Sequence, residues 1–127
     1  MINKIQTSMA PDALGAYSQA IRIGNSLYCS GQIGIDPATK KLKNSDVSVQ
    51  AEQALKNLRA VINVAGFDIQ NIVKSTIFMI NINDFSKINE VYNNFFKDSN
   101  YYPARSAVSI IALPGGAKVE IEVICQK

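Results

Sequence analysis

Two segments of the sequence are apolar on both faces of an extended chain, and this pattern constrains the fold more than any other feature. Residues 72–82 are rich in β-branched side chains and predict a strand, with Ile77 and Met79 on one face and Phe78 and Ile80 on the other. Residues 104–113 show the same two-sided pattern. A strand that is apolar on both faces has to be buried on both faces.

Two segments predict helices. Apolar residues recur at helical spacing through residues 47–65, and Gly66 stands where a helix commonly ends. Residues 85–97 form the second helical pattern. Two helices can cover only one face of a sheet, so the other face needs a partner. We therefore expect an α+β fold, a single mixed β-sheet with two helices on one face, and a homo-oligomer that buries the second face.

The other segments predict the remaining strands and loops. Strands are expected at 2–6, 19–24 and 26–33, loops at 10–18 and 34–46, and a hairpin of residues 104–113 and 117–125 that turns at Pro114-Gly115-Gly116. The 127 residues carry no repeat and no linker, so residues 1–127 are expected to be a single domain.

Composition excludes several classes of function. The chain has no histidine, which removes Ser-His-Asp triads, Cys-His dyads and metal sites built on histidine. Its two cysteines, Cys29 and Cys125, form no CxxC motif, and no metal site is expected. A net charge of +3 does not by itself indicate a nucleic-acid partner. With neither a signal peptide nor an apolar run of about 18 residues, the chain is expected in the cytoplasm and off the membrane.

The candidate site residues lie near the C-terminus. Arg105 opens an apolar strand beside Tyr101 and Tyr102, and its planar fork of donors suits a carboxylate or a phosphate. The alternative is an arginine in a structural salt bridge. Glu120 and Glu122 share one face of the last strand. One of them is a candidate buried base, and the alternative is that both face water.

These segments resemble the signature of the RidA (YjgF) family. The resemblance runs through Gly15-Ala16-Tyr17-Ser18-Gln19-Ala20, Tyr28-Cys29-Ser30-Gly31-Gln32-Ile33-Gly34, Gln53 to Asn57 with Leu58, Ala65-Gly66, Asn89-Glu90-Val91-Tyr92 with Phe95-Phe96, Pro103-Ala104-Arg105-Ser106, Leu113-Pro114 and Val119-Glu120-Ile121-Glu122. The motifs occur in order over essentially the whole chain.

The resemblance implies a fold similar to that of chorismate mutase, assembled as a homotrimer with a cleft between each pair of subunits. It implies hydrolysis of reactive 2-imino acids, such as 2-iminobutanoate and 2-iminopropanoate, to 2-keto acids and ammonia. That activity protects pyridoxal-phosphate enzymes from imine damage, and it uses no cofactor. By family motif, Arg105 holds the substrate carboxylate and Glu120 positions or activates water. The substrate-binding positions that the motifs imply are Tyr17, Ser30, Gly31, Asn89 and the backbone of Ala107.

The sequence departs from the family pattern at two positions, and two alternative functions stand beside the deaminase hypothesis. Ala107 stands where many members carry cysteine, so no thiol chemistry is available there. Ala16 stands where proline is frequent, so the Tyr17 loop is expected to be less rigid. The alternatives are an RNA-acting, endoribonuclease-like protein and a non-catalytic module that binds keto acids or acts as a chaperone.

We also expect Arg105 and Glu120 of one site to come from different subunits. In the predicted hairpin, Glu120 would lie opposite Ile110, which leaves Arg105 roughly 16 Å away along the strand at ~3.3 Å per residue.

Overall fold

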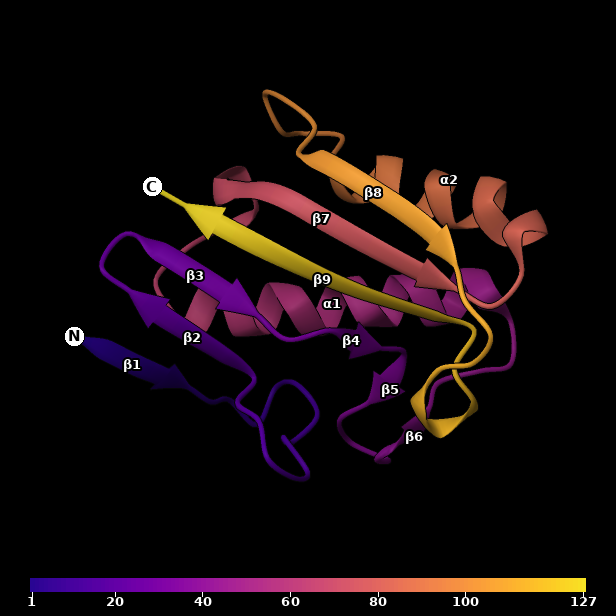
Figure 1. Ribbon diagram of the computed structural model, residues 1–127, viewed down its shortest axis with the longest axis horizontal. Coiled ribbons are helices and arrows are strands. Elements are labelled where there is room, and N and C mark those ends of the chain that lie inside the picture. The colour runs from indigo at the N-terminus through magenta and orange to yellow at the C-terminus, as the bar shows by residue number, and fades with distance from the viewer.

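The computed structural model describes residues 1–127 and is built on one large mixed sheet (Figure 1). Its strands follow the order β1-β2-β3-β9-β7-β8, and β4 pairs with β9 beyond the end of β3. The strands are β1 (Ile2–Ile5), β2 (Ala20–Ile23), β3 (Ser26–Cys29), β4 (Gln32–Ile33), β7 (Ile72–Met79), β8 (Ala104–Ser109) and β9 (Val119–Gln126). A separate small hairpin joins β5 (Ile35–Asp36) to β6 (Lys41–Leu42).

Both long helices lie on one face of this sheet, as the sequence predicts. Helix α1 (Val47–Val64) runs behind the central strands and α2 (Phe85–Phe95) runs behind β7 and β8 (Figure 1). The core lies between these two layers. In β9 the buried side chains alternate strictly with half-buried ones that point to the opposite face. We call that opposite face, which no helix covers, the open face.

Helix α1 has defined ends. Asp46 accepts hydrogen bonds from the backbone N–H groups of Ser48 and Val49, which satisfies donors that the first turn leaves free. At the other end, Arg22 and Lys127 donate to the carbonyl oxygens of Ala65 and Gly66, at 2.8 and 2.6 Å. Two cations at a helix C-terminus also complement the helix dipole. Neither α1 nor α2 is long and apolar enough to cross a membrane.

Buried amides of α1 fix the strand segment that leads into the site. Asn57 donates to the carbonyl oxygens of Ile33 and Ile35, and Gln53 donates to Asn57 at 2.9 Å. Gly34 lies between those carbonyls, and a Cβ there would fall 2.6 Å from the backbone of Gln50. The segment therefore packs directly on the helix backbone, which only glycine allows.

The predicted hairpin of residues 104–113 and 117–125 is wrong. β8 pairs in parallel with β7, and β9 pairs antiparallel with the other edge of β7, so β8 and β9 are not neighbours. The chain reaches β8 through α2, which is the ordinary way to connect parallel strands. Residue Glu120 consequently lies opposite Phe78 of β7, not opposite Ile110.

Three predicted boundaries also change. Residues 26–33 form two strands with a break at Ser30 and Gly31, and the strand predicted at 72–82 ends at Met79. The strand predicted at 104–113 ends at Ser109, because the chain leaves the edge of the sheet there. The segment 34–46, predicted as a loop, contains the β5–β6 hairpin.

Candidate functional site

A cavity of about 880 Å³ opens where β4, β9 and the N-terminal loop meet. Its wall includes four residues that the sequence singled out, namely Tyr17, Ser30, Gly31 and Glu120. Most of the remaining wall comes from the segment 8–14 and the β5–β6 hairpin. A concave site of this kind is the usual form of a small-molecule site.

Glu120 reaches the cavity because Gly31 leaves room for it. The break between β3 and β4 brings the Gly31 backbone against the carboxyl group, and a Cβ on residue 31 would lie 2.0 Å from Glu120 Oε2. No protein hydrogen bond or ion pair occupies this carboxylate. Glycine at this position therefore sets where Glu120 can point.

Burial raises the pKa of Glu120 above the ordinary glutamate value, and the negative charge of Glu122 raises it further. The two carboxylates are half-buried and share the open face of β9, two residues apart. A carboxylate with a raised pKa is a better proton acceptor than an ordinary one, which suits it to general base work.

The loop that carries Tyr17 is held by a residue that the sequence did not single out as functional. Buried Gln19 accepts from the Thr7 N–H at 2.7 Å and donates to the carbonyls of Thr7 and Pro11, which ties the loop into one unit. Ser30 donates to the carbonyl of Ser18 at 2.6 Å. Tyr17 itself is 54% exposed at the cavity rim. Ser30 thus supports the loop, while Tyr17 is free to contact a ligand.

Arg105 lies away from the cavity, on β8 at the edge of the sheet. Its guanidinium donates to Asn89 Oδ1 of α2 at 2.7 Å, so these two predicted site residues are in direct contact. The protein's only ion pair joins Lys43 to Asp36, which means that Arg105 has no carboxylate partner. The structural salt bridge considered as an alternative is absent, and the guanidinium remains able to bind an anion.

The structure divides the seven predicted site residues into two groups. Tyr17, Ser30, Gly31 and Glu120 line the cavity, whereas Asn89, Arg105 and Ala107 lie at the β8 edge next to α2. No arrangement within one chain joins the two groups.

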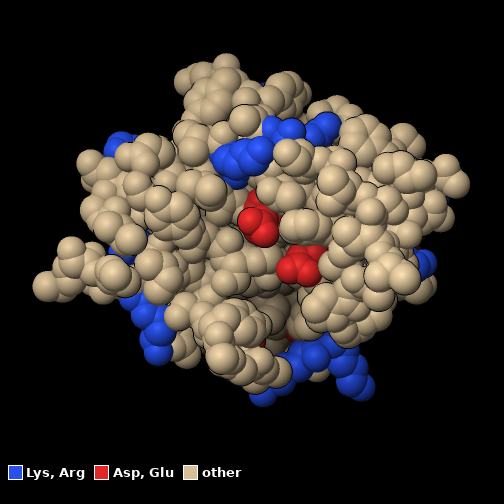
Figure 2. Space-filling view, viewed as in Figure 1, with Lys and Arg blue, Asp and Glu red and all other residues tan.

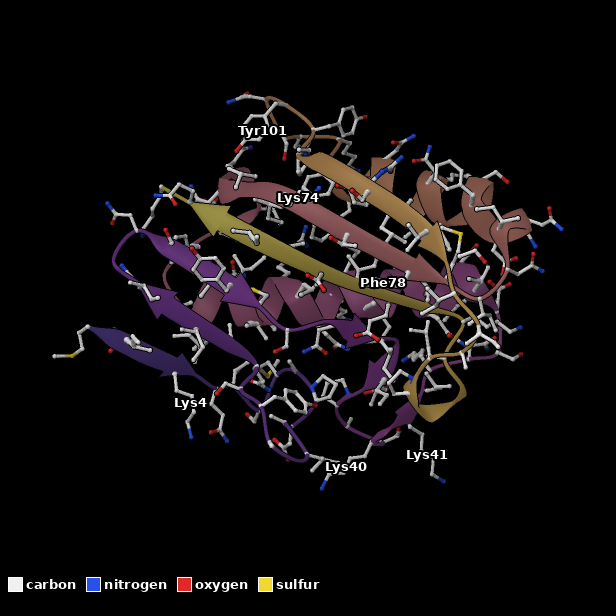
Figure 3. The ribbon with its side chains drawn as sticks, viewed as in Figure 1. Lys4, Lys40, Lys41, Lys74, Phe78 and Tyr101 are labelled. Carbon is white, nitrogen blue, oxygen red and sulfur yellow. The ribbon has the colours of Figure 1, made fainter.

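Charge is distributed unevenly over the open face. Figure 2 shows acidic side chains in the hollowed middle of this face and basic side chains mainly around its margin. Lys74 and Phe78 project from β7 toward the viewer in the same region (Figure 3). The structure holds no group of three or more His, Cys, Asp or Glu side chains able to bind a metal ion. The two groups therefore offer Arg105 as a cation without an acidic partner and Glu120 as a half-buried carboxylate without a hydrogen-bond partner.

The fold and the site together identify the protein family. The fold is a mixed sheet backed by two helices, and the site has an arginine without an acidic partner and a cavity-lining glutamate at the motif positions. The family model described as Endoribonuclease L-PSP matches residues 7–127. The chain belongs to this family, the RidA (YjgF) family.

Relatives of known name agree with this assignment. The chain is 44% identical over 120 residues to human 2-iminobutanoate/2-iminopropanoate deaminase, covering 94% of this chain and 86% of the human protein. It is 49% identical to the RutC family protein y4sK of Sinorhizobium fredii, over 98% of this chain and 97% of that protein.

Solved structures share the fold. The Rid family protein YyfA from Yersinia pestis is 48% identical with a TM-score of 0.97, and the two chains cover each other completely. E. coli TdcF, solved with bound serine, is 40% identical with a TM-score of 0.94 over 98% of both chains. The predicted α+β fold with its mixed sheet is thereby confirmed.

Proposed function

We propose that this protein is a hydrolytic deaminase of small 2-imino acids, which it converts to 2-keto acids and ammonia. The observation that carries the proposal is Arg105, a half-buried guanidinium with a hydrogen bond to Asn89 and no acidic partner. A 2-imino acid supplies the missing anion through its carboxylate.

The chemistry needs little more than orientation and one proton acceptor. A protonated imine is already electrophilic at C2. Glu120 accepts a proton from the attacking water as the C–O bond forms and the C=N π electrons move to nitrogen. The protonated Glu120 then donates this proton to the amine nitrogen of the carbinolamine, and the C–N bond breaks as the hydroxyl loses its proton to Glu120, which releases ammonia and the ketone. A positioned general base contributes about 10²- to 10⁴-fold to such a rate. The cavity beside Glu120 accommodates the imine and its side chain.

We further propose that three chains assemble so that the arginine of one subunit meets the glutamate of the next. Support comes from the open face, where no helix covers the apolar side chains. Ile2, Ile23, Tyr28 and Val108 are each more than 40% exposed there. Exposed apolar surface of this kind marks an interface. A cyclic assembly uses the same two surfaces in every contact, so each interface can build one complete site.

The relatives support the same substrate class. Proteins named 2-iminobutanoate/2-iminopropanoate deaminase from human and rat are 44% and 47% identical to this chain. E. coli TdcF was solved with serine, an amino acid whose carboxylate and small side chain resemble those of the proposed imines. Imines of this kind arise when pyridoxal-phosphate enzymes remove water from serine or threonine, and we place the protein downstream of such reactions in the cytoplasm.

The test is a coupled assay in which an amino-acid dehydratase or oxidase generates the imine. We expect the protein to accelerate release of the 2-keto acid. Arg105→Ala should raise KM or abolish activity with the fold intact, because a charge-assisted hydrogen bond contributes about 1.5–3 kcal/mol. Arg105→Lys keeps the charge but not the two-pronged geometry, so its defect should be mainly in KM. Wild-type rates in Arg105→Ala would overturn the proposal.

The family model's description makes ribonuclease activity the second candidate. The acidic middle of the open face favours the deaminase, because carboxylates repel phosphate backbones. A salt titration of RNA binding separates the two. Tight RNA binding that weakens steeply with salt and survives Arg105→Ala would favour an RNA-acting protein.

A further inference from the structure

Arg105 rests on two aromatic rings of α2. Its Cζ lies 5.4 Å from the ring centroid of Phe85 and 4.9 Å from that of Tyr92. Guanidinium groups stack on aromatic faces because they are planar and weakly hydrated, and the ring face is electronegative. With the Asn89 bond added, three side chains of one helix contact a single guanidinium.

The Tyr92 ring is itself fixed in place. Its hydroxyl donates to Ser75 Oγ at 2.9 Å, and both side chains are buried. Burial raises the pKa of the Tyr92 phenol, so the hydroxyl keeps the proton that it donates. Ser75 is also the residue paired with Arg105 across the β7–β8 ladder. The ring is thus anchored to the strand beside the arginine that it supports.

Two other arginines of the chain also lie over aromatic rings and can be compared with Arg105. Arg22 also lies over a ring, that of Phe67, but its donors are used by the backbone carbonyls of Gly24 and Ala65, and it caps α1. Arg59 lies 5.0 Å from the ring of Phe95 and makes no hydrogen bond to the protein. Arg105 alone combines two rings and an amide while most of its five N–H donors remain free.

We infer that Phe85 and Tyr92 are positioning residues of the anion site. The two rings hold the guanidinium of Arg105 in the plane that presents its fork to a substrate carboxylate. This inference rests on the proposed function. It explains how an arginine without a carboxylate partner keeps one orientation while its donors stay available. It also explains why Arg105→Lys should weaken substrate binding, since an ammonium group is not planar and the two rings cannot fix its orientation.

The test uses Phe85→Leu, with Phe95→Leu as the matched control, because Phe95 also belongs to α2 but its ring lies beneath Arg59 of α1. We expect Phe85→Leu to raise KM for the imine about 3- to 10-fold with kcat within about twofold. Phe85→Tyr should restore KM, and Phe95→Leu should leave it unchanged. An unchanged KM in Phe85→Leu, or an equal rise in Phe95→Leu, would overturn the inference.

A double-mutant cycle asks whether the ring acts through the guanidinium. In the Arg105→Lys background, Phe85→Leu should change KM by less than about twofold. An equal rise in both backgrounds would show a merely structural role. Ser75→Ala is a milder second variant that frees the Tyr92 hydroxyl, and it should raise KM about two- to threefold with little loss of volume. An unchanged KM in Ser75→Ala would mean that the Tyr92 ring does not need this anchor and would overturn its part of the inference.

Binding of 2-oxobutanoate by calorimetry separates this inference from the proposed function. If the wild type hydrolyses imines and Phe85→Leu matches it in both KM and 2-oxobutanoate affinity, only the inference fails. If the wild type neither hydrolyses imines nor binds 2-oxobutanoate, the proposed function fails and the inference falls with it. If it binds without turnover, the same variants are compared by Kd.

Discussion

Arg105 and Glu120 lie on opposite faces of the same sheet. Arg105 pairs with Ser75 and points to the helices, while Glu120 pairs with Phe78 and points to the open face. Phe78 is in turn paired with Val108, three residues beyond Arg105 on β8. The two Cα atoms are therefore separated by about 10 Å along the strands and about 10 Å across them. One small imino acid cannot touch both side chains of a single chain.

This relationship predicts complementation between two inactive variants. Arg105→Ala and Glu120→Ala, unfolded together in equal amounts and refolded, should recover about a quarter of the wild-type activity, since a quarter of randomly formed cyclic interfaces carry both native residues. The measurement is imine hydrolysis, and the wild type refolded alongside is the control. Mixtures that stay inactive would show that the two residues do not share an intersubunit site. A stable monomer in light scattering would contradict the assembly directly.

Gly31→Ala should remove activity without unfolding the protein. The new Cβ would lie 2.0 Å from Glu120 Oε2, and the carboxyl group, as the end of a flexible side chain, gives way. We expect kcat to fall about 10²-fold or more, the contribution of a positioned base. Gly24→Ala is the control, because its φ of +55° strains an alanine with no neighbour within 4 Å. It should lose stability and keep activity. Wild-type turnover in Gly31→Ala would contradict the role of Glu120.

Glu122→Gln should move the acidic limb of the pH–rate profile to lower pH. In the proposed mechanism, activity requires ionised Glu120 and so rises with pH through the pKa of Glu120. That pKa is raised first by burial and then by Glu122, so loss of the Glu122 charge lowers it. Because the folded-state pKa is raised, ionisation of Glu120 opposes folding, and stability declines as pH rises through this interval.

The other charged groups near Glu120 are unchanged in this variant. They are Asp12 and Lys40 of the cavity wall and Lys74 of the open face. Glu52→Gln, on the exposed side of α1, serves as the control and should leave the profile in place. An acidic limb that stays in place in Glu122→Gln would contradict the role of Glu120 as the base. A descending limb that moves to lower pH would mean that Glu120 acts as an acid instead.

Lys40→Gly should stabilise the fold. Lys40 has a φ of +64° and is the only residue other than glycine in that region of backbone conformation. Replacement should raise the free energy of unfolding by about 0.5–1 kcal/mol, measured by chemical denaturation. The same change at neighbouring Lys41, in strand β6, should lower it. A loss of stability in Lys40→Gly would show that the lysine side chain stabilises the β5–β6 hairpin by more than its backbone costs.

Local sequence patterns predicted the helices and strands well, but they did not predict which strands pair in the sheet. Both helices and the strands around residues 72–79 and 119–126 follow from periodicity, which depends on adjacent residues only. The order of β7, β8 and β9 does not follow from periodicity, because the alternation of side chains along one strand does not indicate which strand lies beside it. Adjacency in sequence favoured a hairpin, whereas a crossover helix made β8 an edge strand.

The same limit applies to the site. Sequence motifs identified Arg105 and Glu120, but the register that predicted their separation was wrong, and their placement on opposite faces emerged only from the folded sheet. The apolar spacing of residues 85–97 indicates a helix that contains Phe85 and Tyr92. Their contact with Arg105 depends on how α2 crosses β8, which no local pattern encodes.

The placement of the two groups on opposite faces also bears on inheritance. In a cell that carries one normal and one Arg105-defective copy of the gene, each proposed site takes its arginine from one chain only. About half of the sites would therefore remain intact in mixed copies of the proposed trimer. Activity would then fall in proportion to the fraction of defective chains, and one defective chain would not inactivate the whole assembly. A variant that disrupts the open face removes every site in the trimers it enters, and it would be the dominant one.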